Sequence, residues 1–200
     1  MNILIALAHP DPASFNHAIA QAAQEALLKN GHAVVFHDLH AENFDPIIDR
    51  SELPKQARLD PVLRKHCDEL AGADGLIVVH PNWWGQPPAI LKGWIDRVFR
   101  PGVAYEFLEG DNGEGVPRGL LKLRTALVFN TANTPAQRER TVFGDPLERL
   151  WKDCIFGLCG TAVFYRKMFG VIVTSDAGRR YEWLREVRET VTRHFPRATS

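Results

Sequence analysis

Hydrophobic residues in this chain form short continuous runs that alternate with segments of helical periodicity. The first run spans residues 3–8 and ends at His9 and Pro10, as a strand covered on both faces does. Similar runs predict strands over residues 33–36, 75–80, 123–129 and 162–168. The segments with helical periodicity predict helices over residues 15–29, 61–71, 88–99, 146–158 and 176–195. This alternation predicts an α/β fold, a doubly wound five-stranded parallel sheet with helices on both faces.

The charge balance and composition narrow the classes of protein to consider. The 200 residues include 24 Lys plus Arg and 24 Asp plus Glu, so the formal net charge is zero. A nucleic-acid binder would carry a basic excess, a disordered regulator would have few large apolar residues, and a one-electron flavodoxin shuttle would be strongly acidic. With 45% hydrophobic residues, the chain is expected to fold as a single domain over residues 1–200.

Cysteine usage and the N-terminus predict a cytoplasmic protein. Cys67, Cys154 and Cys159 are an odd number with no metal-ligand spacing, so neither a disulfide framework nor a metal site is expected. The N-terminal apolar run lacks the charged region and the cleavage site of a signal peptide. No apolar stretch reaches the roughly 20 residues that a membrane-spanning helix needs.

The loop after the first strand is a candidate anion site, because ligands of open parallel sheets bind beyond the carboxyl ends of the strands. The loop leads into a helix N-terminus, whose free N–H groups and dipole suit an anion, and His9, Ser14 and Asn16 can add hydrogen bonds. It contains no glycine, so it is neither a Walker loop nor a dinucleotide fingerprint, and a monophosphate fits better. A simple helix cap is the alternative role for Ser14.

Two further loops complete a predicted pocket. Trp83 and Trp84 follow Pro81, and Gly85 permits a backbone conformation that other residues avoid, so two indoles offer flat walls for a planar ring. Packing of both tryptophans in the core or at an interface is the alternative. Residues 130–135 supply hydroxyls and amides after the fourth strand. Together the loops predict a ligand with a phosphate at one end and a flat heteroaromatic ring at the other.

Four segments resemble the flavodoxin-like NAD(P)H quinone oxidoreductases: His9–Pro10, residues 14–16, residues 81–98 and residues 105–107. This family includes the mammalian DT-diaphorase type, bacterial drug-modulator quinone reductases and ancillary proteins of glutathione-gated potassium efflux. The resemblance covers nearly the whole chain. It implies a bound flavin, reduced by hydride from NADH or NADPH and reoxidised by a quinone or another flat, electron-poor acceptor in a two-electron ping-pong cycle.

The resemblance also implies roles for particular residues. The phosphate end of the flavin would be held by His9, Ser14, Phe15 and Asn16. The isoalloxazine ring would be bordered by Pro81, Asn82, Trp83, Trp84 and Gly85, and its polar edge would be bound by Asn130, Thr131, Ala132 and Asn133. Tyr105 and Phe107 are expected near the substrate mouth.

Two departures from the family pattern limit what can be carried over. The mammalian type places a histidine before its Gly-Asp pair and a tyrosine nearby; here Phe143 precedes Gly144–Asp145 and Gln137 stands near the tyrosine's position, so no catalytic residue is assigned. The chain is shorter than the long FAD-binding members. FMN is therefore the expected cofactor, and FAD is the alternative.

The resemblance further suggests partners and competing functions. The family usually forms a two-fold dimer with the active site at the interface, which makes Trp151 and Phe156 interface candidates. A flavin-binding ancillary subunit that contacts a membrane transporter is the alternative function. Hydrolysis by Ser14 is disfavoured, because the G-x-S-x-G elbow is absent. Lys92, Asp96 and Arg97 are expected to be structural or to face a partner, and Arg179, Arg180, Arg185 and Arg188 to form a solvated face.

Overall fold

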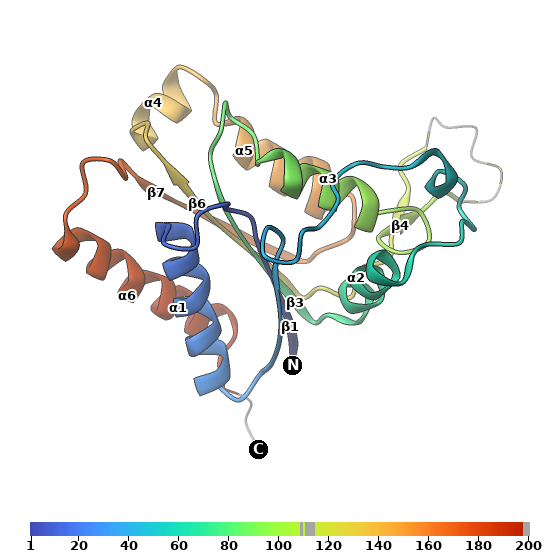
Figure 1. Ribbon diagram of the computed structural model, residues 1–200, viewed down its shortest axis with the longest axis horizontal. Helices are drawn as coiled ribbons and strands as arrows, with labels where there is room; N and C mark the ends of the chain where they lie inside the picture. Colours follow the sequence, from blue (N-terminus) through green and yellow to red (C-terminus); the bar gives the residue numbers. More distant parts are fainter. Residues whose placement is uncertain (109, 111–114, 198–200) are drawn as a thin grey trace.

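The chain folds around a five-stranded parallel sheet with the strand order β2-β1-β3-β6-β7 (Figure 1). The computed structural model describes residues 1–108, 110 and 115–197. The strands are β1 (Asn2–Leu7), β2 (Ala33–Asp38), β3 (Gly75–Pro81), β6 (Thr125–Ala132) and β7 (Val163–Gly170). From β1 the chain adds β2 on one side and then β3, β6 and β7 in succession on the other. The topological switch point, where the strand order reverses, therefore lies between β1 and β3. The predicted doubly wound sheet is confirmed.

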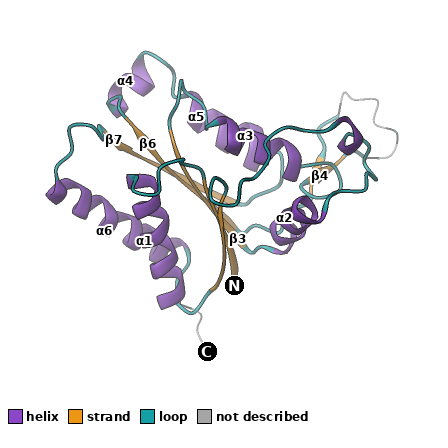
Figure 2. Cartoon of the chain, in the orientation of Figure 1, coloured by secondary structure: helices purple, strands orange, loops and turns teal. Residues whose placement is uncertain are grey.

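Helices cover both faces of the sheet (Figures 1 and 2). One face carries α1 (Phe15–Lys29) and α6 (Ala177–His194); the other carries α2 (Pro61–Gly72), α3 (Ala89–Val98) and α5 (Pro146–Arg149), which continues as a π-helical segment over Leu150–Gly157. Shorter elements are a 3₁₀ turn at Arg50–Glu52, α4 (Ala136–Thr141) and a hairpin of β4 (Tyr105–Glu106) and β5 (Arg118–Gly119). The turn, α4 and the hairpin were not predicted, and part of the segment expected to be loop over 100–119 is therefore paired.

Polar caps define where the helices begin, as the sequence indicated. The Ser14 hydroxyl accepts from the backbone N–H of His17 at the start of α1, and the Asp176 carboxylate accepts from that of Arg179 at the start of α6. Helix α1 ends at Lys29 with Asn30 as its C-cap, and Gly31 follows with a φ of 81°, a conformation that glycine adopts without strain.

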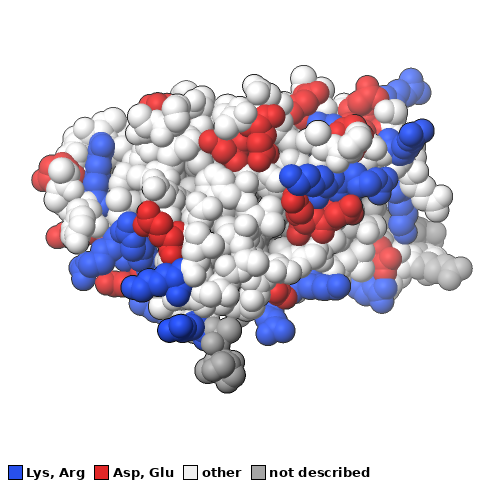
Figure 3. All heavy atoms as spheres, turned by 60° about the horizontal axis from the view of Figure 1, so that its bottom comes forward, with Lys and Arg blue, Asp and Glu red and all other residues white. Residues whose placement is uncertain are grey.

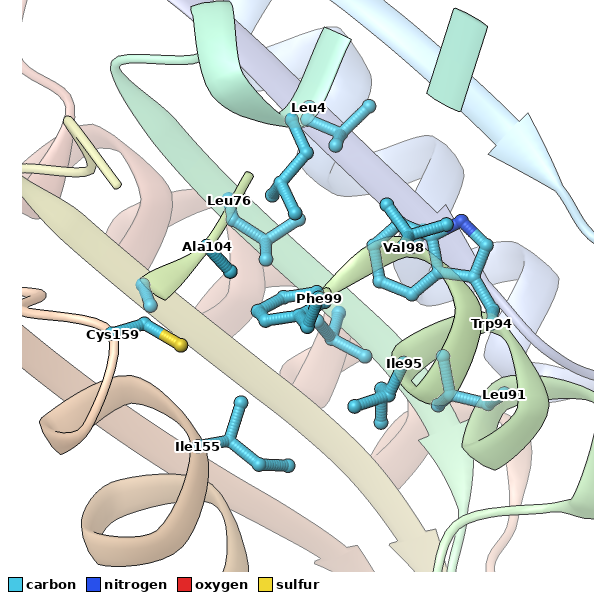
Figure 4. Close-up of a cluster of buried hydrophobic side chains, with 14 of the residues drawn as sticks. Leu4, Leu76, Leu91, Trp94, Ile95, Val98, Phe99, Ala104, Ile155 and Cys159 are labelled. Atoms are coloured by element: carbon cyan, nitrogen blue, oxygen red, sulfur yellow. The ribbon is translucent and has the colours of Figure 1, made fainter. Parts of the chain in front are cut away.

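The core consists of two hydrophobic clusters, one on each face of the sheet. Figure 4 shows part of the cluster beneath α3, to which Trp94 and Phe99 belong together with Leu4 and Leu76 of the sheet. The rings of Trp94 and Phe99 meet edge to face with centroids 5.5 Å apart. Successive side chains of a strand thus point into the two clusters in turn, so both faces of the strand are apolar. This explains why hydrophobic residues form continuous runs instead of alternating with polar residues.

Trp151 and Phe156 belong to this core, so the prediction that they lie at an interface is wrong. Both side chains are fully buried, and their rings stack with centroids 5.6 Å apart. The Trp151 indole also donates to Nε2 of His80 over 3.1 Å. The π-helical winding of this segment changes the spacing of its buried positions, so α-helical periodicity could not identify its inner face.

Strand β6 is longer than predicted. Asn130, Thr131 and Ala132 were expected in a loop, but they are the last residues of the strand and pair with β7. Asn130 and Thr131 also pair with His80 and Pro81 of β3. Their backbones are therefore held rigidly by two neighbouring strands. The polar character of Asn130 and Thr131 made this end of a buried strand resemble a loop.

Of the charged residues of α3, Arg97 has a structural role, which is one of the two roles predicted for them. Lys92 and Asp96 form an exposed ion pair of 2.5 Å. Arg97 is buried and donates to the carboxylate of Glu52 and to the backbone oxygen of Asp45. On the face shown in Figure 3, acidic and basic side chains are interspersed. Within the described part of the chain, no helix combines the length and the apolar character needed to cross a bilayer.

Candidate functional site

A cavity of about 390 Å³ lies beyond the carboxyl ends of β1, β3 and β6. We call it the binding cavity. Its volume is in the range of small-molecule sites, and it lies beside the topological switch point, where ligands of this sheet type bind. Larger surface hollows of about 470 and 620 Å³ are lined mainly by charged side chains of α6 and of the segment 51–64.

Most of the predicted cofactor-binding residues line the binding cavity. They are His9, Ser14, Phe15, Asn16, Pro81, Asn82, Trp83, Thr131, Ala132 and Asn133, joined by Ala13, Thr134, Ile172 and Arg180. Trp84 and Gly85 line an adjoining side cavity of about 380 Å³, which shares Asn82 and Thr134 with the first. Three loops far apart in sequence therefore meet at one place.

Three of the residues that were predicted to form the site contribute to neither of these two cavities. Asn130 is fully buried beneath the binding cavity. Tyr105 and Phe107 lie in and next to β4, on the side of the molecule near α2 (Figure 1), and their rings meet edge to face with centroids 5.8 Å apart. Within one copy of the chain, these two aromatic residues are thus separate from the binding cavity.

One end of the binding cavity is built to receive an anion. It lies at the N-terminus of α1, where Ser14 caps the helix. Asn16 is buried and donates from Nδ2 to the Thr131 hydroxyl over 3.1 Å, so α1 is tied to the end of β6. Helix capping by Ser14 and a place in an anion site are compatible, because one oxygen can serve both.

Arg180 adds a positive charge to this end, and the prediction that it belongs to a solvated face is wrong. Its guanidinium lies 5.8 Å from the Phe15 ring centroid. It donates to the Ser175 hydroxyl over 2.9 Å and to the Ile172 carbonyl over 3.3 Å. By contrast, Arg179, Arg185 and Arg188 form exposed ion pairs with acidic residues, as expected. Charge periodicity alone could not separate Arg180 from these neighbours on α6.

The other end of the binding cavity is bordered by the tryptophan loop. Trp83 and Gln86 exchange two backbone hydrogen bonds of 3.0 Å, and Trp84 and Gly85 between them both have positive φ, as in a type I′ turn. The Gly85 N–H donates to Oδ1 of Asn82 over 2.9 Å. Trp83 is 45% exposed and Trp84 fully exposed, so core packing of the two indoles is ruled out.

His9 lies between the two ends with its pKa lowered. Burial is the main cause, and the charge that His17 carries when protonated lowers it further. The Nδ1 atom of His9 accepts from the Asp11 N–H over 3.1 Å, and the imidazole lies 6.3 Å from the Trp83 ring centroid. His9 therefore contributes a neutral ring to the wall of the binding cavity.

A polar network that the sequence did not reveal supports the floor of the site. The buried guanidinium of Arg166 donates to Asn130 Oδ1 over 2.7 Å, to Glu148 over 2.9 Å and to Asp145. Beside this network, burial lowers the pKa of His80 to about 4, so its ring is neutral and accepts from Trp151. Arg166 was missed because it stands, beside Lys167, in the middle of a strand whose other side chains are mostly apolar.

A second cluster, of His37, Glu42 and His66, has ligand atoms within 4.8 Å of one another. However, the Trp94 indole donates to Nδ1 of His66 over 3.1 Å, so a neutral His66 must carry its proton on Nε2, which points to Glu42. A metal ion at Nε2 would need the lone pair of that nitrogen, so the ring proton would have to move to Nδ1. Nδ1 could then no longer accept the hydrogen bond from the indole. The cluster is a hydrogen-bonded network, and burial, with the charge of His37, lowers the pKa of His66 to about 4.

Comparison with known proteins agrees with this architecture. A family model described as flavodoxin-like fold matches residues 1–189. The chain is 35% identical to an uncharacterized NAD(P)H oxidoreductase of Haemophilus influenzae, over 88% of this chain and 87% of that protein. It is 39% identical to the rat NAD(P)H dehydrogenase [quinone] 1 over 52% of this chain and 45% of that protein. A crystal structure from Streptococcus mutans superposes with a TM-score of 0.83 at 33% identity, covering 96% of this chain and all of that one. The chain therefore belongs to the flavodoxin-like fold family.

Proposed function

We propose that this protein is a flavin-dependent NAD(P)H:quinone oxidoreductase. One observation carries the proposal: the binding cavity has an anion-binding end, with the α1 N-terminus and Arg180, and at its other end Trp83 and the adjoining side cavity offer a pair of exposed indoles. Relatives named NAD(P)H oxidoreductase and NAD(P)H dehydrogenase [quinone] support the same reaction class.

The residues present fit a flavin mononucleotide. Ser14, the first N–H groups of α1 and Arg180 would hold its phosphate, and Trp83 and Trp84 would border its ring. A bound flavin supplies the hydride-transfer chemistry, while the protein supplies binding, orientation and electrostatic tuning. A single helix N-terminus with one arginine suits one phosphate group, which favours FMN; FAD is the alternative, and NADH or NADPH is the donor.

The end of β6 would position the polar edge of the ring. Thr131, Ala132 and Asn133 line the binding cavity, and Asn133 also accepts from the Val173 N–H over 3.1 Å, which holds the segment after β7 beside it. Asn130 has a different role from the one expected. It lies beneath these residues and accepts from Arg166, so we assign it as a positioning residue that does not touch the cofactor.

We further propose that the site is completed by a second copy of the chain. Phe143 exposes apolar surface in the side cavity beside Trp84, and Val173, whose backbone N–H donates to Asn133, exposes apolar surface beside the binding cavity. Tyr105 and Phe107 are far from the cavity of their own chain, so a role at the substrate mouth requires that they reach the site of a partner copy. A homodimer with the site at its interface satisfies both observations.

The proposal is tested on the purified protein. We expect the protein to bind FMN, its visible absorbance to bleach on addition of NADH or NADPH, and the colour to return when a benzoquinone is added. Failure to take up any flavin on reconstitution would overturn the proposal. Flavin binding without turnover of free quinones would instead favour the ancillary-subunit alternative, in which the chain acts by contacting a membrane transporter.

A further inference from the structure

A hydrogen-bonded chain of three side chains leads from the binding cavity to the end of β2. The Ser14 hydroxyl lies 2.9 Å from Nδ1 of His17, and Nε2 of His17 lies 2.9 Å from Oδ2 of Asp38. Ser14 lines the cavity, whereas His17 and Asp38 lie behind it and are about one-fifth exposed.

The surroundings of Asp38 determine where the protons lie. Its Oδ1 accepts from the backbone N–H groups of His40 and Ala41, both at 3.1 Å, so Asp38 is held as an acceptor. Nε2 of His17 must then carry a proton. In neutral His17 the remaining nitrogen, Nδ1, has only a lone pair, and the Ser14 hydroxyl donates its single proton to it. In this state Ser14 has no proton left to offer to a ligand in the cavity.

Protonation of His17 reverses this hydrogen bond. Nδ1–H then donates to the Ser14 oxygen, which also accepts from the backbone N–H of His17 over 3.4 Å. With both lone pairs used, the hydroxyl proton is free to point into the cavity. We propose that the site takes up a phosphate group together with one proton, which His17 holds, so that Ser14 can donate to the phosphate. This inference rests on the proposed function and names a regulation of the same site.

Several charged and titratable groups lie around His17. Asp38 faces it from β2 with its carboxylate oxygen 2.9 Å from Nε2, while His40 follows Asp38 in the same turn. In the loop before α1, His9 lies 6.4 Å away ring to ring and its pKa is lowered, and Asp11 stands next to His9. On the other side of the cavity, Arg180 of α6 already carries a positive charge toward the ligand. His17 is therefore the group that adds a charge when the phosphate binds.

Linkage gives the measurable consequence. Because the complex holds more protons than the free protein, FMN affinity falls as the pH rises, by up to about tenfold per pH unit. The phosphate of FMN is itself a dianion well above its pKa of about 6, so the effect is measured above about pH 7.5. Riboflavin has the same ring and no phosphate, and its affinity is expected to be independent of pH over the same range.

The experiment is isothermal titration of the flavin-free full chain with FMN and with riboflavin. Titrations in buffers of different ionisation enthalpy give the number of protons taken up. We expect uptake approaching one proton with FMN and none with riboflavin. In His17→Gln and Ser14→Ala the uptake with FMN should vanish, whereas His194→Gln, a histidine of α6 outside the cavity, should leave it unchanged.

Asp38→Asn is the sharpest variant. An asparagine can still accept the two backbone N–H groups through Oδ1, while its amide donates to Nε2 of His17. Neutral His17 must then carry its proton on Nδ1 and donate to Ser14, so the hydroxyl is free at every pH. We expect this variant to bind FMN without proton uptake and with an affinity that no longer falls with pH.

The outcomes separate the two proposals. FMN binding by the unaltered chain without proton uptake, or uptake that persists in both His17→Gln and Asp38→Asn, would overturn the inference and leave the proposed function standing. Absence of binding for both FMN and riboflavin would overturn the proposed function and the inference with it. Circular dichroism of each variant shows that it is folded before its heats are compared.

Discussion

The Arg166 guanidinium donates to the amide oxygen of Asn130 over 2.7 Å, which joins the middle of β7 to the end of β6 directly beneath the binding cavity. Asn130 is fully buried, so Arg166→Leu leaves its oxygen without a partner. Asp145 and Glu148 lose their cation too, but both are partly exposed and can be hydrated. We expect a loss of about 2 to 3 kcal/mol in the free energy of unfolding, measured by urea denaturation.

Arg185→Leu is the matched control for this prediction. Arg185 pairs with Glu189 on the surface of α6, and its side chain is 66% exposed. Exposed pairs of this kind contribute at most about 0.5 kcal/mol. Equal losses in the two variants would show that the buried network under the cavity has no special role in stability.

The pH dependence of stability follows from His80 and His66. Burial lowers the pKa of each to about 4, whereas an unfolded histidine titrates near its ordinary value of 6.5. Between these values the unfolded chain binds more protons than the folded one, so stability increases with pH. We expect the urea midpoint to be highest above about pH 6.5 and to fall as the pH decreases toward about 4. A midpoint that stays constant between about pH 7 and 5 would contradict this, and His66→Gln should reduce the slope.

Gly93 in α3 is a position where a methyl group has no room. A Cβ there would come closer than 3.0 Å to the backbone oxygen of Pro46. Gly93→Ala is expected to push the 45–48 segment from the helix and to lower the unfolding free energy by about 1 to 3 kcal/mol. Gly72, the last residue of α2, has nothing within 4 Å of its Cβ position. Gly72→Ala should therefore raise stability by about 0.5 kcal/mol, and a loss in both variants would argue against the steric reason.

Trp84 combines backbone strain with full exposure, which points to a binding role. Its φ of 57° is unfavourable for a bulky residue. Its indole is fully exposed, so no packing within its own chain compensates for that strain. Trp84→Gly should raise the unfolding free energy by up to about 1 kcal/mol while increasing the KM for a quinone. Leu53→Ala, at another exposed apolar side chain, should change neither value. An unchanged KM in Trp84→Gly would remove the indole from the proposed site.

Arg180 is expected to recognise the phosphate rather than the ring. Arg180→Gln removes the charge that faces the α1 N-terminus, and hydrogen bonds to charged groups are worth about 1.5 to 3 kcal/mol. We expect FMN affinity to fall by roughly one to two orders of magnitude and riboflavin affinity to stay nearly the same. Fluorescence titration with the two flavins measures both. A similar loss for both flavins would indicate that Arg180 acts through the structure of the cavity.

The fold could be predicted almost entirely from the sequence. Continuous apolar runs such as residues 3–8 and 75–80 indicated strands buried on both faces, and caps such as Ser14 and Asp176 marked where helices begin. These signals are local, because hydrogen-bonding geometry and side-chain burial repeat with fixed periods along each element. The error at Trp151 arose because the helical period itself changes in that segment.

The three loops of the site were also evident in the sequence, because chain order and sheet topology together bring the carboxyl ends of the strands to one edge. Only the tertiary structure decided that Asn130 lies under the cavity, that Arg180 faces it while Arg179 does not, and that His17 connects Ser14 to Asp38. Each of these depends on contacts between residues far apart in the chain, or on the rotation of one helix against the sheet. Neighbouring positions in a sequence carry no information about such contacts, since packing of whole elements determines them.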